Sequence, residues 1–150
     1  PGLQSVVIKS SHVKLAPMPG HIKVEYSSEA AMQNGTAAIC SSGTATLECA
    51  MANLPTVVCY KMSYVNWGLF NLLGKVKYIS IVNLIAEKKI IPELIQHKMT
   101  PKNIIKKIFP YLDIKSKKRM KTVRHFDALR KNLGQRGVFD RIANFILREN

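Results

Sequence analysis

Cysteine is scarce in this sequence, and its three thiols form no C-x-x-C pair. The odd number of cysteines and the absence of a C-x-x-C pair argue against a disulfide framework and against a zinc site. Small buried residues in a reduced compartment are the expected role of these thiols. They are Cys40, Cys49 and Cys59. The four histidines are scattered without an H-x-x-x-H pair, so we expect no bound metal and no cofactor.

Long apolar runs are also absent. The most apolar region, residues 49–73, is interrupted by polar residues, a proline and a glycine, so a membrane-spanning helix is not expected. No cationic leader with an apolar core and a cleavage site is present. The chain begins with Pro1, close to a strand-like run, and we expect it to be a fragment or a truncated reading frame.

Acidic residues are few, because 9 Asp and Glu stand against 23 Lys and Arg. The excess of basic residues is distributed unevenly along the chain. Residues 101–150 contain fourteen basic and four acidic residues, which gives a net charge of +10. Such a segment suits nucleic acid, an anionic membrane surface or an anionic substrate. Lysines on solvated helix faces would explain it equally well.

Strand-like and helix-like segments alternate over the first 85 residues. The predicted strands are residues 6–8, 22–26, 37–40, 56–60 and 78–82. The predicted helices are residues 27–33, 45–53 and 65–73, then 87–96, 101–109, 115–133 and 138–146. This alternation predicts the α/β class, a parallel sheet with flanking helices on both faces. We divide the chain into an incomplete domain, residues 1–112, and basic C-terminal helices, residues 113–150, that pack on it.

Residues 42–48, Ser-Gly-Thr-Ala-Thr-Leu-Glu, join a predicted strand to a predicted helix. The first turn of a helix has unpaired N–H groups and the positive end of the helix dipole. Gly43 would let a phosphate approach them. Thr44 and Glu48 are four residues apart and share a helix face, which adds a hydroxyl and a carboxylate that can accept from ribose. An ordinary capped helix is the alternative, because no Walker or G-x-G-x-x-G motif is present.

Asn83 follows the predicted strand 78–82. Ligands of parallel α/β sheets bind beyond the carboxyl ends of the strands, and an amide there can hold a hydroxyl or a phosphate oxygen. A turn residue that bonds its own backbone is the alternative.

Three ordered blocks resemble the lipid-A-disaccharide synthase family. They are S-G-T-A-T-L-E at 42–48, P-T-V-V-C-Y-K-M-S at 55–63, and Y-I-S-I-V-N-L-I-A at 78–86 followed by I-P-E-L-I-Q at 91–96. The resemblance covers about residues 36–110. Val82 stands where the family commonly has proline, and Glu87-Lys88 where it commonly has Gly-Arg.

The resemblance implies a Rossmann-like parallel sheet with flanking helices, part of the C-terminal half of a GT-B glycosyltransferase that is an inverting hexosyltransferase. The implied reaction transfers 2,3-diacylglucosamine from its UDP conjugate to 2,3-diacylglucosamine 1-phosphate and releases UDP, during lipid A synthesis in a Gram-negative bacterium. It also implies a cytoplasmic enzyme that is peripheral at the inner face of the inner membrane, with no metal. The partners would be both acylated substrates, the N-terminal half of the enzyme and an anionic membrane surface, and a homodimer is left open.

The residues that the motifs assign to the UDP-sugar are Ser42, Gly43, Thr44, Ala45, Thr46, Glu48 and Asn83. No catalytic residue is assigned, because the resemblance places the base in the half of the enzyme that this sequence lacks. Two rival readings remain. One is a non-enzymatic basic module that binds nucleic acid through residues 101–150, although no specific nucleic-acid motif is present. The other is an inactive remnant of the synthase.

Overall fold

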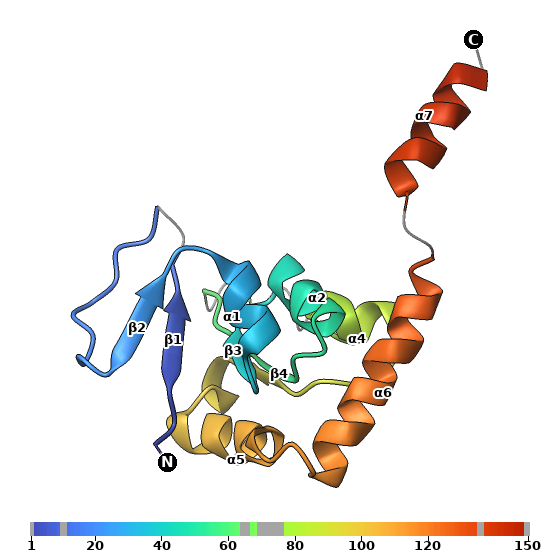
Figure 1. The fold of residues 1–150 in the computed structure, drawn as a ribbon. Coiled ribbons are helices and arrows are strands. Elements are labelled where there is room, and N and C mark those ends of the chain that lie inside the picture. Colours follow the sequence, from blue (N-terminus) through green and yellow to red (C-terminus); the bar gives the residue numbers. More distant parts are fainter. Residues whose placement is uncertain (1, 10–11, 64–66, 69–76, 135–136, 149–150) are drawn as a thin grey trace.

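Five parallel strands form two separate sheets in the computed structural model, which describes residues 2–9, 12–63, 67–68, 77–134 and 137–148. The first sheet contains β1 (Ser5–Ile8) and β2 (Ile22–Glu25), and the second has the order β3-β4-β5, with β3 (Ala38–Cys40), β4 (Thr56–Tyr60) and β5 (Glu93–Ile95). All pairings are parallel. The helices are α1 (Ser28–Asn34), α2 (Thr44–Met51), α4 (Ile81–Ile85), α5 (Pro101–Leu112), α6 (Lys117–Asn132) and α7 (Val138–Arg148), with a short 3₁₀ turn, η1 (Gln96–Lys98). The predicted α/β class with flanking helices is confirmed (Figure 1).

Two apolar cores lie on opposite faces of β4, because successive side chains of a strand point to opposite faces. Val58 belongs to a core with α2, α4 and α6 that includes the fully buried Phe126. Val57 belongs to a second core with α5, which supplies Tyr111. Helices therefore cover both faces of the three-stranded sheet, as expected for a parallel sheet that is buried on both sides.

Residues 78–82, predicted as the last strand, do not form one. Ser80 is instead the N-cap of α4, and its hydroxyl oxygen accepts from the Asn83 N–H at 3.3 Å. The carboxylate of Glu93 binds the N–H groups of Ile79 and Ser80. These hydrogen bonds use backbone groups that a strand would have offered to a neighbour, and the chain turns into a helix.

Residues 87–96, predicted as a helix, contain β5 instead. Apolar residues at 90, 91, 94 and 95 fit one helix face, but they fit a buried strand as well. Pro92 disfavours the helical conformation of the residue before it, and its carbonyl accepts from the Val58 N–H at 2.9 Å. Pairing with β4 decides between the two structures. Of the predicted helix 65–73, the structure describes only Trp67 and Gly68, which are helical, and the rest lies outside the described residues.

The C-terminal helices begin with clear capping signals. Thr100 caps α5, with Pro101 at the first helical position, and Ser116 caps α6. α6 packs against α2 and α5, whereas α7 extends away from the rest of the molecule (Figure 1). Among the described residues, no helix is both long enough and apolar enough to cross a bilayer.

Glu87, directly after α4, provides a first prediction. Its φ is +51°, a left-handed conformation that costs a residue with a side chain about 1–2 kcal/mol and costs glycine little. Glu87→Gly should therefore raise the free energy of unfolding by about 0.5–1 kcal/mol, after the larger unfolded-state entropy of glycine is subtracted. Urea denaturation followed by circular dichroism measures this. Lys88→Gly is the matched control, and it should destabilise because Lys88 lacks a positive φ.

Candidate functional site

The turn between β3 and α2 forms the N-terminal end of α2. β3 ends at Cys40 and α2 begins at Thr44, with Gly43 as the N-cap at φ 141° and ψ −163°. Thr46 N–H already donates to the Gly43 carbonyl at 3.1 Å. Within the described part of the chain, the N–H groups of Thr44 and Ala45 have no acceptor. The turn thus presents donors at the positive end of the helix dipole.

Ser42 and Thr46, two of the predicted ligand residues, use their hydroxyl groups within the protein. Ser42 Oγ donates to the Ile79 carbonyl at 2.6 Å, which ties the turn to the segment before α4. Thr46 is 1% exposed, and its Oγ1 donates to the Gly43 carbonyl at 2.8 Å. Both side chains therefore hold the turn in shape, and neither points its hydroxyl into solvent.

Thr44 and Glu48 are exposed and line the same surface cavity, as their spacing predicts. The cavity has a volume of about 590 Å³ and lies between α1 and α2. Its lining consists of Ser28, Glu29, Met32, Gln33, Thr44, Leu47, Glu48, Met51 and Ala52. Apolar side chains thus form the walls, and two carboxylates and two hydroxyls provide polar contacts. Such a lining suits a ligand with a flat or apolar portion and a few polar groups.

The contribution of α1 to this cavity is not apparent from the motifs. Ser28 and Glu29 lie in the first turn of α1, and Met32 is one turn further along. The sequence predicts α1 only as a short helix. The available signal is that α1, like α2, directly follows a parallel strand, and ligands of parallel α/β sheets bind beyond the carboxyl ends of the strands.

Asn83, the last of the predicted ligand residues, lies in a fully buried polar network. It is 0% exposed, and its Nδ2 donates to the Ile91 carbonyl at 2.9 Å and to Glu93 Oε1 at 2.8 Å. Its Oδ1 accepts from the N–H groups of Ile90 at 2.7 Å and of Ile91 at 3.0 Å. The structure therefore does not bring the Asn83 amide to the cavity beside Thr44. The amide instead binds Glu93, which in turn binds Ile79, the residue to which Ser42 of the turn donates.

Glu93, the first residue of β5, is the centre of the same network. Its carboxylate accepts from the N–H of Ser80 at 2.9 Å and from the Ser80 hydroxyl at 2.6 Å. It also accepts from the Ile79 N–H at 3.3 Å. Three kinds of donor thus stabilise a carboxylate that is 9% exposed. The carbonyl of Ile79 is the one that Ser42 binds, so the network reaches the turn through a single residue.

Two cysteine thiols interact between β3 and α2, those of Cys40 at the end of β3 and Cys49 in α2. A hydrogen bond between the Cys40 and Cys49 thiols raises the pKa of Cys40 and lowers that of Cys49 to about 7, against the opposing effect of burial on Cys49. Burial also raises the pKa of Cys59. All three are free thiols. In the part of the chain that the structure describes, no three His, Cys, Asp or Glu side chains are grouped as metal ligands.

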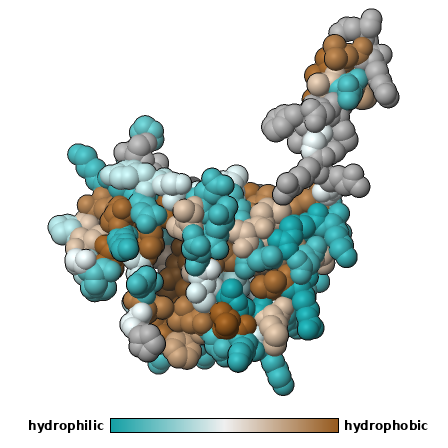
Figure 2. Space-filling model, viewed as in Figure 1, coloured by the Kyte–Doolittle hydropathy of each residue, from teal (hydrophilic) through white to brown (hydrophobic). Residues whose placement is uncertain are grey.

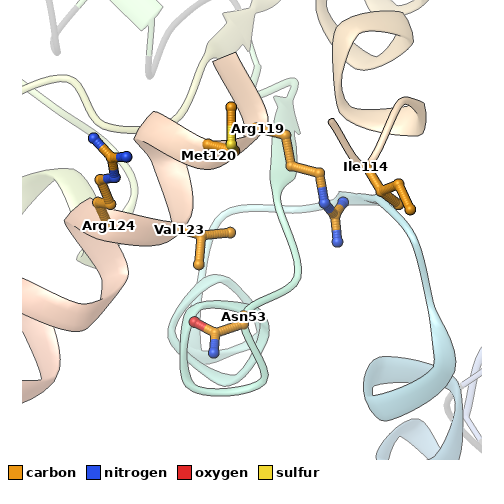
Figure 3. Close-up of a pocket in the computed structure, with 6 residues that line it drawn as sticks. All are labelled: Asn53, Ile114, Arg119, Met120, Val123 and Arg124. Carbon is orange, nitrogen blue, oxygen red and sulfur yellow. The ribbon is translucent and has the colours of Figure 1, made fainter. Parts of the chain in front are cut away.

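A second cavity, of about 400 Å³, lies near the other end of α2 (Figure 3). Asn53 follows α2, and α6 supplies Arg119 and Arg124 to the lining. Figure 3 shows the two guanidinium groups pointing in different directions. Arg119 donates to the carbonyls of Thr36 and Tyr111. Its charge therefore holds α6 against the body of the protein, and we regard this cavity as structural.

Comparison with known proteins gives a consistent result. Residues 6–139 match the family model described as lipid-A-disaccharide synthetase. The lipid-A-disaccharide synthase of Sulfurihydrogenibium sp. is 35% identical over 124 residues, which are 83% of this chain and 32% of the relative. That of Wigglesworthia glossinidia brevipalpis is 44% identical over 95 residues, 63% of this chain and 24% of the relative. The chain thus spans about a quarter to a third of the curated relatives that it matches.

Proposed function

The chain belongs to the lipid-A-disaccharide synthase family, and we propose that it forms the part of this glycosyltransferase that binds the UDP-linked donor sugar. The proposed overall reaction is the inverting transfer of 2,3-diacylglucosamine from its UDP conjugate to 2,3-diacylglucosamine 1-phosphate. One observation carries the proposal. Thr44 and Glu48 line one cavity that runs along α2 and begins at its N-terminal end, where the helix dipole is positive and the N–H groups of Thr44 and Ala45 are open.

We assign the diphosphate to the N-terminal end of α2. Gly43 would allow close approach, and the N–H groups of Thr44 and Ala45 with the Thr44 hydroxyl would donate to phosphate oxygens. Glu48 lies one helical turn further along the same face, where its carboxylate would accept from the two ribose hydroxyls. The apolar wall of the cavity would then contact the remaining nucleoside.

Ser42, Thr46 and Asn83 take a different part in this proposal. Their side chains hold the backbone that the ligand meets, since Ser42 binds Ile79 and Thr46 binds Gly43. Asn83 supports the segment that contains Ile79 through Glu93. The proposal therefore separates ligand contacts at 43–45 and 48 from positioning residues at 42, 46 and 83. It assigns no catalytic base to this chain.

Titration with UDP tests the site directly. Amide resonances of residues 43–48 should shift on addition of UDP, and those of α5 should not. Glu48→Ala should weaken UDP binding by about ten- to a hundredfold, which corresponds to the loss of charge-assisted hydrogen bonds worth about 1.5–3 kcal/mol. Pyrophosphate has no ribose, and so its affinity should stay equal or rise slightly when the negative charge is removed.

Glu29→Ala is the matched control, because Glu29 lines the same cavity in the first turn of α1. It removes an equal charge without removing the proposed ribose contact. Equal weakening of UDP and pyrophosphate by Glu48→Ala would contradict the ribose role. Unchanged amide resonances at 43–48 in millimolar UDP would contradict the site.

We further propose that the chain acts at an anionic membrane surface on the cytoplasmic side. Its support is the net charge of +10 over residues 101–150 and the exposed apolar side chains of α7. These are Ile142, Phe145, Ile146 and Leu147, 50–74% exposed. The chain should sediment with vesicles that contain anionic lipid and dissociate in 0.5 M salt, where the Debye length is roughly sevenfold shorter than at about 0.01 M. Phe145→Ser should weaken this binding several-fold, and Met18→Ser, an exposed apolar control, should not. Equal binding to neutral vesicles would contradict the proposed role of the positive charge in membrane binding.

A further inference from the structure

The side chains of Cys40 and Cys49 face each other across the interface between β3 and α2. Cys40 is paired with Val58 of β4, and the side chains of paired residues in a parallel sheet point to the same face. Val58 packs in the core that includes Ala50 of α2, so the Cys40 side chain also points toward α2. Cys49 lies on the buried stripe of this helix, together with Thr46 and Ala50. The topology therefore directs both sulfur atoms into one interface.

The two thiols are in contact in this interface. The Cys40 thiol donates a hydrogen bond to the Cys49 sulfur, which lowers the pKa of Cys49 to about 7 although burial opposes the shift. A large share of Cys49 is therefore thiolate at neutral pH. The thiolate is the form of cysteine that reacts with oxidants. A reactive thiolate thus lies beside a second thiol that can combine with it.

Cys59, the third cysteine, lies apart from this pair. It packs with Val57 in the core that contains Tyr111 of α5, on the other face of the sheet. Burial raises the pKa of Cys59, so this thiol stays largely protonated at neutral pH. The chain therefore contains one coupled pair of thiols and one isolated thiol, which serves as an internal reference for the pair.

The surface reaches the pair through Cys40. Cys49 is 2% exposed, whereas Cys40 is only half-buried. Cys40 ends β3, a terminal strand of its sheet. Figure 2 shows an apolar recess beside this strand, between the β1–β2 pair and the rest of the molecule. An apolar recess admits a small neutral molecule more readily than a charged thiol reagent, because charge is costly to remove from water. These properties favour an uncharged hydroperoxide as the oxidant.

We propose that Cys40 and Cys49 form a reversible oxidation site, at which a hydroperoxide converts the two thiols into a disulfide. The Cys49 thiolate attacks one oxygen of the peroxide, the O–O bond breaks, and the departing hydroxide takes a proton from solvent and leaves as water. The Cys40 sulfur then attacks the sulfur of the resulting sulfenic acid, the S–O bond breaks, and the hydroxide leaves as water with the Cys40 proton. The pair loses two electrons and two protons, and hydrogen peroxide is reduced to two molecules of water. A thiol reductant reverses the reaction by disulfide exchange.

The disulfide would close a ring around the turn before α2. This ring contains Gly43, Thr44 and Glu48. Sulfur atoms in a disulfide are about 2.05 Å apart, closer than any noncovalent contact between two thiols. The end of β3 and α2 must therefore approach each other, which moves the N–H groups of Thr44 and Ala45. The oxidised chain should bind UDP at least threefold more weakly than the reduced chain, a consequence that rests on the proposed function, whereas the oxidation itself does not.

Thiol counting on the full 150-residue chain tests the site. The chain is treated with stoichiometric hydrogen peroxide, quenched with catalase and labelled in urea with a maleimide, and the number of labels is read from the intact mass. The folded chain should lose two of its three thiols at least tenfold faster than the third, remain monomeric, and recover all three on reduction. When the peroxide is added in urea, where the fold no longer holds the pair together, the three thiols should react at similar rates.

Three variants identify the pair. Cys59→Ser is the matched control, and it should still lose two thiols at the rate of the unchanged chain. Cys40→Ser removes the thiol that completes the disulfide, so Cys49 should stop at the sulfenic acid, which dimedone traps. Cys49→Ser removes the thiolate, so Cys40 should keep its thiol.

Retention of all three thiols in the folded chain would overturn the proposal. A disulfide that Cys59→Ser abolishes, or one that links two chains, would overturn it as well, and these outcomes do not require either variant of the pair to fold. UDP titration of the reduced chain separates the two proposals, because absence of binding there refutes the proposed function and leaves the thiol result intact. Equal UDP affinity of the oxidised and reduced chains would overturn the link between the disulfide and the turn.

Discussion

Asn83→Ala should lower the free energy of unfolding by about 3–5 kcal/mol, the largest loss expected from a single substitution of a polar residue in this chain. Truncation removes four hydrogen bonds of 2.7–3.0 Å. It leaves the N–H and the carbonyl of Ile91 without partners beside a side chain that is 0% exposed, whereas the Ile90 N–H keeps its hydrogen bond to the Lys88 carbonyl at 3.0 Å. The Glu93 carboxylate also loses one of its donors. Each buried group left unsatisfied costs about 1–3 kcal/mol, and partial entry of water limits the sum.

Urea denaturation measures the effect, with Asn34→Ala as the matched control. Asn34 is exposed, and its amide makes one hydrogen bond, to the Ala30 carbonyl, so the same truncation there should cost less than about 1 kcal/mol. Asn83→Asp adds a second test. It preserves the shape but places a carboxylate where the amide lies 2.8 Å from Glu93 Oε1. Repulsion raises the pKa of the introduced carboxyl group in the folded state, so this variant should gain stability as the pH falls.

A cost below 1 kcal/mol for Asn83→Ala would show that the network is not a major source of stability. The same variant separates structure from binding. If Asn83 acts only by positioning residues 78–82, its loss should weaken UDP in proportion to the loss of folded protein. A large loss of UDP affinity at unchanged stability would instead indicate a direct ligand contact.

The segment around Asn83 is also where prediction from the sequence fails, and the reason is physical. The alternating apolar residues of 78–82 suit a strand, and residues 90–95 suit a helix face. Neither pattern contains the information that Glu93, a buried carboxylate in β5, collects the N–H groups of Ile79 and Ser80. That interaction joins positions 13 and 14 residues apart and decides both structures together. Local periodicity does not detect it.

Elements with local signals were predicted well. The strands β1 to β4 coincide with short apolar or alternating runs. α5 begins where Thr100 and Pro101 provide a cap and a first helical residue. The turn before α2 was also predicted, from the small hydroxyl residues and the glycine that separate a strand-like run from a helix-like one, and Gly43 there has a φ of +141°. The role of each residue in that turn was not predictable. The hydroxyls of Ser42 and Thr46 could have faced a ligand, and only the fold shows that they face the protein.

Gly43→Ala is the second large effect that we expect, and it acts on the ligand more than on the fold. At φ 141° and ψ −163°, Gly43 occupies a region that residues with a side chain enter only at a cost of about 1–3 kcal/mol. A Cβ built there would meet no heavy atom within 4 Å. The substitution therefore causes backbone strain but no clash, and the protein should still fold. The methyl group would project into the open space that the diphosphate is proposed to occupy.

We therefore expect Gly43→Ala to lower the midpoint of thermal unfolding by several degrees and to weaken UDP binding at least tenfold at temperatures where the variant is fully folded. Gly20→Ala is the control, because Gly20 also has no neighbour within 4 Å of a built Cβ but has no positive φ. It should change neither quantity. The decisive measurement is the UDP affinity of the folded Gly43→Ala protein. If strain lowers its stability while UDP binds as before, the diphosphate does not lie over the first turn of α2, because a methyl group at this position would obstruct it.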